Sequence, residues 1–257
     1  MQNEQKVESL KTKGFTGNQL KLFAIIAMTI DHLTCVIWPG YNYDWWIILL
    51  HIIGRLTAPT MWFMCAEGYA HTHNVKKYIA RLFVFAFISH FAYNFAFGIP
   101  FIPFKTTVFN QTSVIWALAW GIVLLCIIDA QFLKQWQKTL FVFVITAIVF
   151  PADWSSIAVL AIMEIHIHRG SLTKQILHME KWVLLYALVW FFCIDKVYAF
   201  IQLGVIIVWP FVKNYNGQRG GMKFMKWFFY IYYPAHLVLC GLIRLYLHGN
   251  ISAIVGG

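Results

Sequence analysis

Residues 20–38 read LKLFAIIAMTIDHLTCVIW, and this stretch decides the fold class. At about 1.5 Å per residue, an apolar helix of this length crosses the ~30 Å hydrocarbon core of a bilayer. Asp31 and His32 lie inside it. Ionisable side chains in a membrane segment are costly and are candidates for function. The structural alternative is that both side chains only hydrogen-bond to neighbouring helices.

The whole chain continues this apolar character. Of its 257 residues, 60% are hydrophobic and 12% are charged, and the mean hydropathy is +0.66. These values are typical of a polytopic membrane protein. We therefore expect residues 1–257 to form a single membrane-embedded domain, in which residues 1–18 are a polar cytoplasmic segment. The five cysteines have no metal-ligand spacing, so we expect small core residues and no metal site.

Apolar segments divide the chain into a series of candidate helices. They cover residues 20–38, 45–70, 78–97, 112–129, 139–150, 155–168, 182–193, 197–212 and 224–247. The fifth, sixth and seventh are short for a membrane span of ~20 residues. The sequence therefore predicts an all-α polytopic bundle of about nine transmembrane helices, with eight to ten as the range.

Basic residues indicate the orientation. With the amino terminus inside and the loops assigned alternately, most of the 20 Lys and Arg residues fall on the cytoplasmic side. This is the positive-inside pattern of membrane proteins. It accounts for most of the net charge of +10, so we expect the lipid bilayer and no nucleic acid as a partner.

Ionisable groups from four segments are expected at similar depth. Helical rise places His32, Arg55, His90 and His236 between the middle and the outer half of the membrane, together with Asp31. Neighbouring helical residues point about 100° apart, so Asp31 is poorly placed to orient His32. Arg55 is the better partner for Asp31, because an unpaired buried charge is very costly. The structural alternative is a polar network without chemistry, and for His90 alone it is simple packing.

Further polar residues lie near the membrane edges. Glu67 and His71 are expected at the inner edge, and Asp153 at the outer edge. The sequence Glu164-Ile165-His166-Ile167-His168 does not predict a helical metal site from its histidines, because residues two apart point to different helix faces.

Several motifs occur in an order that resembles the TraX family. The matching stretches are Met28-Thr29-Ile30-Asp31-His32, Ile53-Gly54-Arg55-Leu56, Ala66-Glu67-Gly68-Tyr69, Pro151-Ala152-Asp153 and Tyr233-Pro234-Ala235-His236. The chain departs from the family pattern at Thr57-Ala58-Pro59-Thr60 and at His73.

This resemblance implies a multi-pass acyltransferase of the bacterial cytoplasmic (inner) membrane. It implies cytosolic acetyl-CoA as the acyl donor. The acceptor is either a pilin-like N-terminal amine or a hydroxyl of a surface glycan, within or across the membrane. The departures bear on the acceptor more than on the chemistry.

Acyl transfer needs a base for the acceptor and a group that holds the oxyanion. We expect His32 to be the general base or a transient acyl carrier, and His236 is the second candidate for either role. Arg55 is a candidate for the oxyanion, and pairing with Asp31 is its alternative. Candidates for the phosphates of coenzyme A are Lys76, Lys77, Arg81 and Arg219, although the positive-inside pattern alone also explains them.

Two other functions compete with this hypothesis. A proton-coupled transporter also buries His, Asp and Arg at mid-membrane, but such proteins often show inverted repeats, and none is visible here. A non-catalytic membrane assembly factor would retain its function without His32.

Overall fold

The computed structural model describes residues 14–105, 108–221 and 224–253 of the chain. Most of the expected cytoplasmic segment, residues 1–13, lies outside this range. In the described residues the chain is all-helical and has no strand, only two isolated β-bridges. The helices are α2 (Gly17–Ile37), α3 (Trp45–Gly54), α4 (Thr57–His71), α5 (Val75–Phe97), α6 (Val114–Asp129), α7 (Gln135–Val149), α8 (Ser155–Ile167), α9 (Leu172–Cys193), α10 (Lys196–Gln202), the 3-10 helix η1 (Leu203–Ile207), α11 (Val208–Lys213) and α12 (Met225–His248).

Six helical stretches of the described chain are long and apolar enough to cross a membrane. They cover residues 17–37, 45–71, 75–97, 172–193, 196–213 and 227–248. The helices α6, α7 and α8 are apolar but shorter. The multi-pass character is therefore confirmed, whereas a count of nine transmembrane helices remains a prediction.

Large apolar side chains on the outer surface agree with a lipid environment. Phe87 of α5, Phe143 of α7 and Phe192 of α9 are 68%, 69% and 78% exposed. An apolar surface of this extent is rare in soluble monomers and marks contact with lipid or protein.

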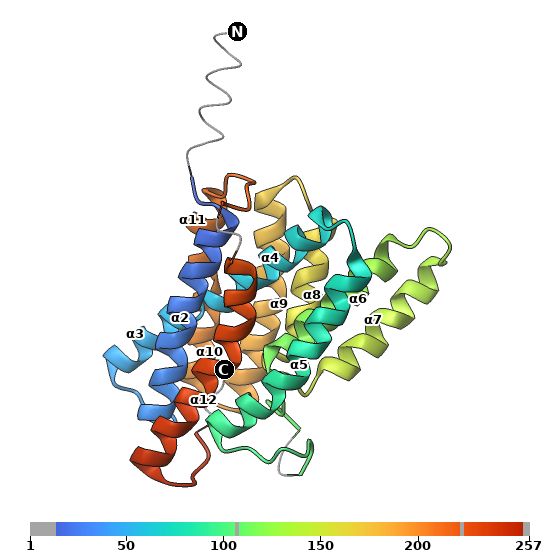
Figure 1. Cartoon of the computed structure of the whole chain (residues 1–257). Coiled ribbons are helices and arrows are strands. Elements are labelled where there is room, and N and C mark those ends of the chain that lie inside the picture. The colour runs from blue at the N-terminus through green and yellow to red at the C-terminus, as the bar shows by residue number, and fades with distance from the viewer. Residues whose placement is uncertain (1–13, 106–107, 222–223, 254–257) are drawn as a thin grey trace.

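The helices form one bundle in which distant parts of the sequence meet. Helix α5 packs against both α12 and α6, and α8 packs against α4, α6 and α9. Helix α2 contacts α3, α4 and α12. Figure 1 shows α2, α3 and α12 at one end of the bundle and α6 and α7 at the other. The first and last long helices, and with them His32 and His236, are therefore neighbours.

The second apolar segment is broken in the structure. The sequence predicted one segment over residues 45–70, but α3 ends at Gly54 and α4 begins at Thr57. Pro59 explains the break, because proline has no N–H to donate to the carbonyl of Arg55 four residues earlier. The interruption places Arg55 at the junction of two helices, inside the bundle.

The seventh segment is longer than the sequence indicated. The apolar run covers residues 182–193, whereas α9 begins at Leu172 and has 22 residues. The first part of α9 is polar, so the hydropathy of the sequence did not indicate that the helix begins at Leu172. This extension brings His178 and Lys181 alongside α8, which packs against α9.

Candidate functional site

Asp31 is the centre of a buried charged network. Its Oδ2 lies 3.0 Å from Nη2 of Arg55, and its Oδ1 lies 2.7 Å from Nδ1 of His51. Arg55 and His51 are each 2% exposed, and Asp31 is 7% exposed. The predicted pairing of Asp31 with Arg55 is confirmed. His51 was not predicted, although its spacing of four residues from Arg55 places both on one face of the segment.

Arg55 is held on several sides. Its Nη1 donates to Oε1 of Gln202 at 3.1 Å, and its Nε donates to the carbonyl oxygen of His51 at 3.2 Å. The guanidinium also lies 5.3 Å from the ring centre of Trp154. Since Nε, Nη1 and Nη2 all have protein acceptors, this arrangement fits the pairing role better than a role at the oxyanion.

Gly54 allows α3 to approach Asp31 closely. A Cβ at this position would overlap with Cβ and Cγ of Asp31. The absence of a Cβ at Gly54 is therefore a condition for the close contact between α2 and α3.

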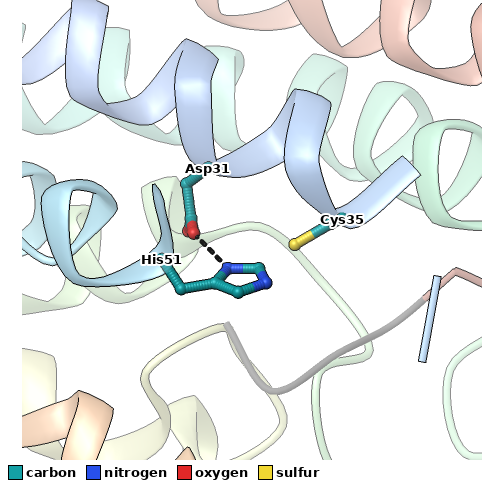
Figure 2. A group of neighbouring side chains, drawn as sticks. All are labelled: Asp31, Cys35 and His51. Carbon is teal, nitrogen blue, oxygen red and sulfur yellow. Dashed lines mark hydrogen bonds and ion pairs between the residues drawn. The ribbon is translucent and has the colours of Figure 1, made fainter. Parts of the chain in front are cut away.

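Cys35 lies beside the contact between Asp31 and His51. Figure 2 shows the sulfur of Cys35 near the imidazole of His51, one helical turn from Asp31. The ligand atoms of these three residues lie within 4.8 Å of one another, which is a spacing that could hold a metal ion. Both oxygens of Asp31 are already bonded, however, and a cation here would face the Arg55 guanidinium. We assign these residues to the ion-pair network.

His32 and His236 form a pair beside this network. Nδ1 of His32 lies 2.8 Å from Nε2 of His236, and the two rings are within 10° of parallel. His236 is 5% exposed, and His32 is partly exposed. The pair joins α2 to α12, so two histidines that are 204 residues apart share one hydrogen bond. The sequence predicted that the two histidines lie at a similar depth in the membrane, but it did not predict their hydrogen bond.

The hydrogen bonds of this pair assign its tautomers. Nδ1 of His236 lies 3.1 Å from the carbonyl oxygen of Tyr232, which can only accept. His236 therefore carries its proton on Nδ1, and its Nε2 accepts from Nδ1–H of His32. In the neutral pair, Nε2 of His32 then has a free lone pair. A nitrogen in this state can take a proton or attack an acyl carbon.

Aromatic side chains fix the orientation of the pair. The ring of Tyr232 stacks on His236 at 5.3 Å, and its hydroxyl bonds Oγ1 of Thr29 at 2.8 Å. The edge of Phe97 meets His32 at 5.5 Å. These contacts hold both rings from α2, α5 and α12, which makes the hydrogen bond between them a fixed feature.

Two other predicted residues lie apart from the histidine pair. Nε2 of His90 bonds the carbonyl oxygen of Phe101 at 2.8 Å, which fits the packing alternative. Asp153 is buried in the turn between α7 and α8, where burial raises its pKa to about 7 although nearby Arg55 opposes the shift. It thus borders the Asp31 network from the α7–α8 side.

Glu67 and His71 belong to a separate ion pair. Oε1 of Glu67 accepts from Nε of Arg169 at 3.1 Å, and its Oε2 lies 3.3 Å from Nε2 of His71. Arg169 follows α8, so these contacts tie α4 to the turn between α8 and α9. They are not in contact with His32.

The predicted phosphate-binding cations divide into two groups. Lys76 and Lys77 are exposed in the first turn of α5. Arg81 lies 5.9 Å from the ring of Tyr78 and beside Tyr230 of α12. Arg219 is exposed in the loop before α12, within electrostatic range of Lys21 in α2. Lys21, which the sequence did not single out as a phosphate ligand, lies near Arg219 in the first turns of α2.

Comparison with known proteins identifies the family of this chain. A family model described as "TraX protein" matches residues 16–244. The chain belongs to the TraX family. The match includes every residue of the Asp31 network and both histidines of the pair.

A curated relative of this TraX chain comes from Dichelobacter nodosus. It is named "Probable fimbrial assembly protein FimC, serogroup H1", and it is 28% identical over 240 residues. The alignment covers 91% of the present chain and 97% of the relative. No solved structure matches this chain. The resemblance found in the sequence is therefore confirmed at the level of the family.

Proposed function

We propose that this TraX chain is a membrane acyltransferase that moves an acetyl group from cytosolic acetyl-CoA to an acceptor amine. The observation that carries the proposal is the His32–His236 pair, in which the free nitrogen of His32 is a base held in one orientation. The pair lies in a bundle of apolar helices, and histidine is the side chain that most often acts as a general base in enzymes.

The proposed reaction needs one proton acceptor. The acceptor amine attacks the thioester carbonyl carbon, and Nε2 of His32 takes a proton from the nitrogen as the C–N bond forms. The C–S bond then breaks, and the thiolate of coenzyme A receives that proton from His32. His236 accepts from Nδ1–H of His32 throughout, so it stabilises the imidazolium that forms between the two steps. An acetyl group carried on Nε2 of His32 is the stepwise alternative.

Cations at the end of the same helices support an acyl-CoA donor. Lys21 lies eleven residues before His32 on α2, which is about 16 Å along the helix. Arg219 is near Lys21, and Arg81 lies beside Tyr230 on α12. We propose that these residues, with Lys76 and Lys77, bind the phosphates, since Arg and Lys are the usual phosphate partners. The pantetheine arm would then extend along α2 and α12 towards His32.

The name of the relative favours a protein acceptor over a glycan. That protein is named for fimbrial assembly. For the present chain we propose a pilin-like N-terminal amine that reaches the site from the outer side of a bacterial cytoplasmic membrane, with the amino terminus of this chain inside. A surface-glycan hydroxyl is the other acceptor that the test distinguishes.

The test uses the purified full chain in detergent with acetyl-CoA that carries a labelled acetyl group. A peptide with a free N-terminal amine is compared with the same peptide already acetylated at that amine, and with a soluble glycan. We expect release of free coenzyme A and labelled product only with the free amine. We also expect acetyl-CoA to raise the melting temperature, because a ligand that binds only the folded state stabilises it.

Two results would replace the proposal. Labelled glycan would change the acceptor and keep the donor. If acetyl-CoA neither turns over nor raises the melting temperature, the donor is wrong. A proton-coupled transporter that uses the same buried histidines would then be the leading function.

A further inference from the structure

A second group of polar residues joins the last turn of α8 to the first turns of α9. Glu164 and His168 are four residues apart near the end of α8, and His178 lies on the facing side of α9. Their ligand atoms lie within 4.8 Å of one another. These residues have no part in the function proposed above.

The contacts within this group are too long for charged hydrogen bonds. Oε2 of Glu164 lies 3.3 Å from Nε2 of His168 and 3.4 Å from Nδ1 of His178. Charged N–H···O bonds are usually about 2.7–2.9 Å long. Nδ1 of His178 is buried and makes no hydrogen bond within the described part of the chain. Three polar atoms thus converge on one point at distances longer than those of charged hydrogen bonds.

The same distances match the edges of a metal tetrahedron. Zinc lies about 2.0–2.1 Å from histidine nitrogen and carboxylate oxygen, so two ligand atoms of a tetrahedral site are about 3.3 Å apart. The two measured edges are 3.3 and 3.4 Å. The ring centres of His168 and His178 are 3.9 Å apart.

The other carboxylate oxygen of Glu164 is held by the protein. Its Oε1 lies 2.7 Å from Nζ of Lys181 and 3.2 Å from Nε1 of Trp182. These bonds fix the carboxylate so that Oε2 faces the two histidines. Partners of this kind orient the ligands of natural metal sites.

We propose that Glu164 Oε2, His168 Nε2 and His178 Nδ1 form a binding site for zinc or a similar divalent transition metal. The ion clamps α8 to α9 at the end that we expect to face the cytosol, and water completes the tetrahedron. The ligand set has a Glu and a His four residues apart on one helix, with a second His from its neighbour. His166 is not part of this set, because its Nε2 points elsewhere and lies 2.9 Å from Oδ1 of Asp129. The prediction of no metal site did not consider Glu164 with His168.

The test measures metal binding to the full chain in detergent, purified with a tag that contains no histidine. The protein is stripped with a chelator and titrated with Zn²⁺ against a chromophoric competitor. We expect one equivalent of tightly bound zinc in the wild type and none in His178→Ala. The matched control is His166→Ala, which removes a histidine of the same helix end and should retain the full equivalent.

Cobalt gives a second readout that needs no variant. Co²⁺ in the wild-type site should show the visible absorption of a tetrahedral nitrogen and oxygen site. An intense thiolate-to-cobalt band would place a cysteine among the ligands and overturn the proposal. It would equally be overturned if the wild type binds no stoichiometric zinc, or if folded His178→Ala binds as much zinc as the wild type.

Discussion

The chain contains two histidine pairs whose nitrogens face different partners. In the His32–His236 pair, one ring nitrogen points at the other at 2.8 Å, and the rings are nearly parallel. In the His168–His178 pair, the rings are closer, at 3.9 Å between centres, yet one nitrogen of each points at Glu164. In the first arrangement, the hydrogen bond from one imidazole to the other holds both rings in one orientation. In the second arrangement, one nitrogen of each histidine and one oxygen of Glu164 surround a common point. The distance between two histidine rings therefore says little about their function. The direction in which the ring nitrogens point shows whether the pair forms a hydrogen bond or could bind a ligand.

The carboxylates beside the two pairs also differ. Asp31 has both oxygens bonded to deeply buried partners, Arg55 and His51. Glu164 has one oxygen bonded to Lys181, whose side chain is 51% exposed, and the other faces the two histidines. Asp31 is thus part of the framework that positions His32, while Glu164 is available to a ligand.

The largest effect on stability is expected for Asp31→Asn. This change leaves Arg55 charged, buried and without its carboxylate, which costs about 3–5 kcal/mol. The free energy of unfolding is measured by SDS titration from mixed micelles. Asp195→Asn is the control, because Asp195 bonds the hydroxyl of Tyr43 at an exposed site. Equal losses in the two variants would show that the Asp31 network is not the framework.

His236 is expected to act through His32 as a positioning residue. His236→Ala should lower kcat by about one to two orders of magnitude, towards the lower end of the effect of acid–base groups, with little change in KM. His236→Gln should recover part of the loss, because its Oε1 can still accept from Nδ1–H of His32. Rates of coenzyme A release with the amine peptide measure both. If Ala and Gln are equally slow, the hydrogen bond is not what orients His32.

Gly54→Ala tests the close approach of α3 to Asp31. The added methyl group would overlap with Asp31, and overpacking of this kind costs about 1–3 kcal/mol. Gly221→Ala is a matched control, since a Cβ there meets nothing within 4 Å. The same SDS titration compares the two. A Gly54→Ala protein as stable as the control would mean that α2 and α3 do not pack as described.

Glu164→Gln is expected to lower the free energy of unfolding least among these variants. The comparison is made with a chelator present, so that no metal ion contributes. The lost ion pair with Lys181 is partly exposed, and such pairs contribute about 1 kcal/mol or less. The comparison is again the free energy of unfolding. A loss as large as that of Asp31→Asn would remove the contrast between the two carboxylates.

The sequence predicted the parts of the site that depend on depth and charge. Asp31 and Arg55 had to pair, because neither can be buried alone in an apolar bundle. His32 and His236 were placed at one depth by counting residues along helices. Depth also suggested His90, which instead bonds the backbone at Phe101. Depth gives no rotation about the helix axis, and rotation decides which of these residues meet.

The features that the sequence did not predict depend on contacts between helices, which the order of residues along one helix does not specify. His51 was overlooked because it lies in an apolar run, although it shares a face with Arg55. His178 lies in the polar first part of α9, which hydropathy did not identify as a helix. The break between α3 and α4 could have been predicted from Pro59, whose missing N–H frees the carbonyl of Arg55.

The most direct test of the account is transfer of labelled acetyl by His32→Ala, measured with the amine peptide and compared with wild type and His90→Ala. His90 is the matched control, because it lies in α5, another long apolar helix, and its Nε2 bonds a backbone carbonyl outside the site. The account predicts that His32→Ala, folded and still stabilised by acetyl-CoA, loses about 10²–10⁴-fold in rate, while His90→Ala stays near wild type. A His32→Ala protein that transfers acetyl at the wild-type rate would contradict it.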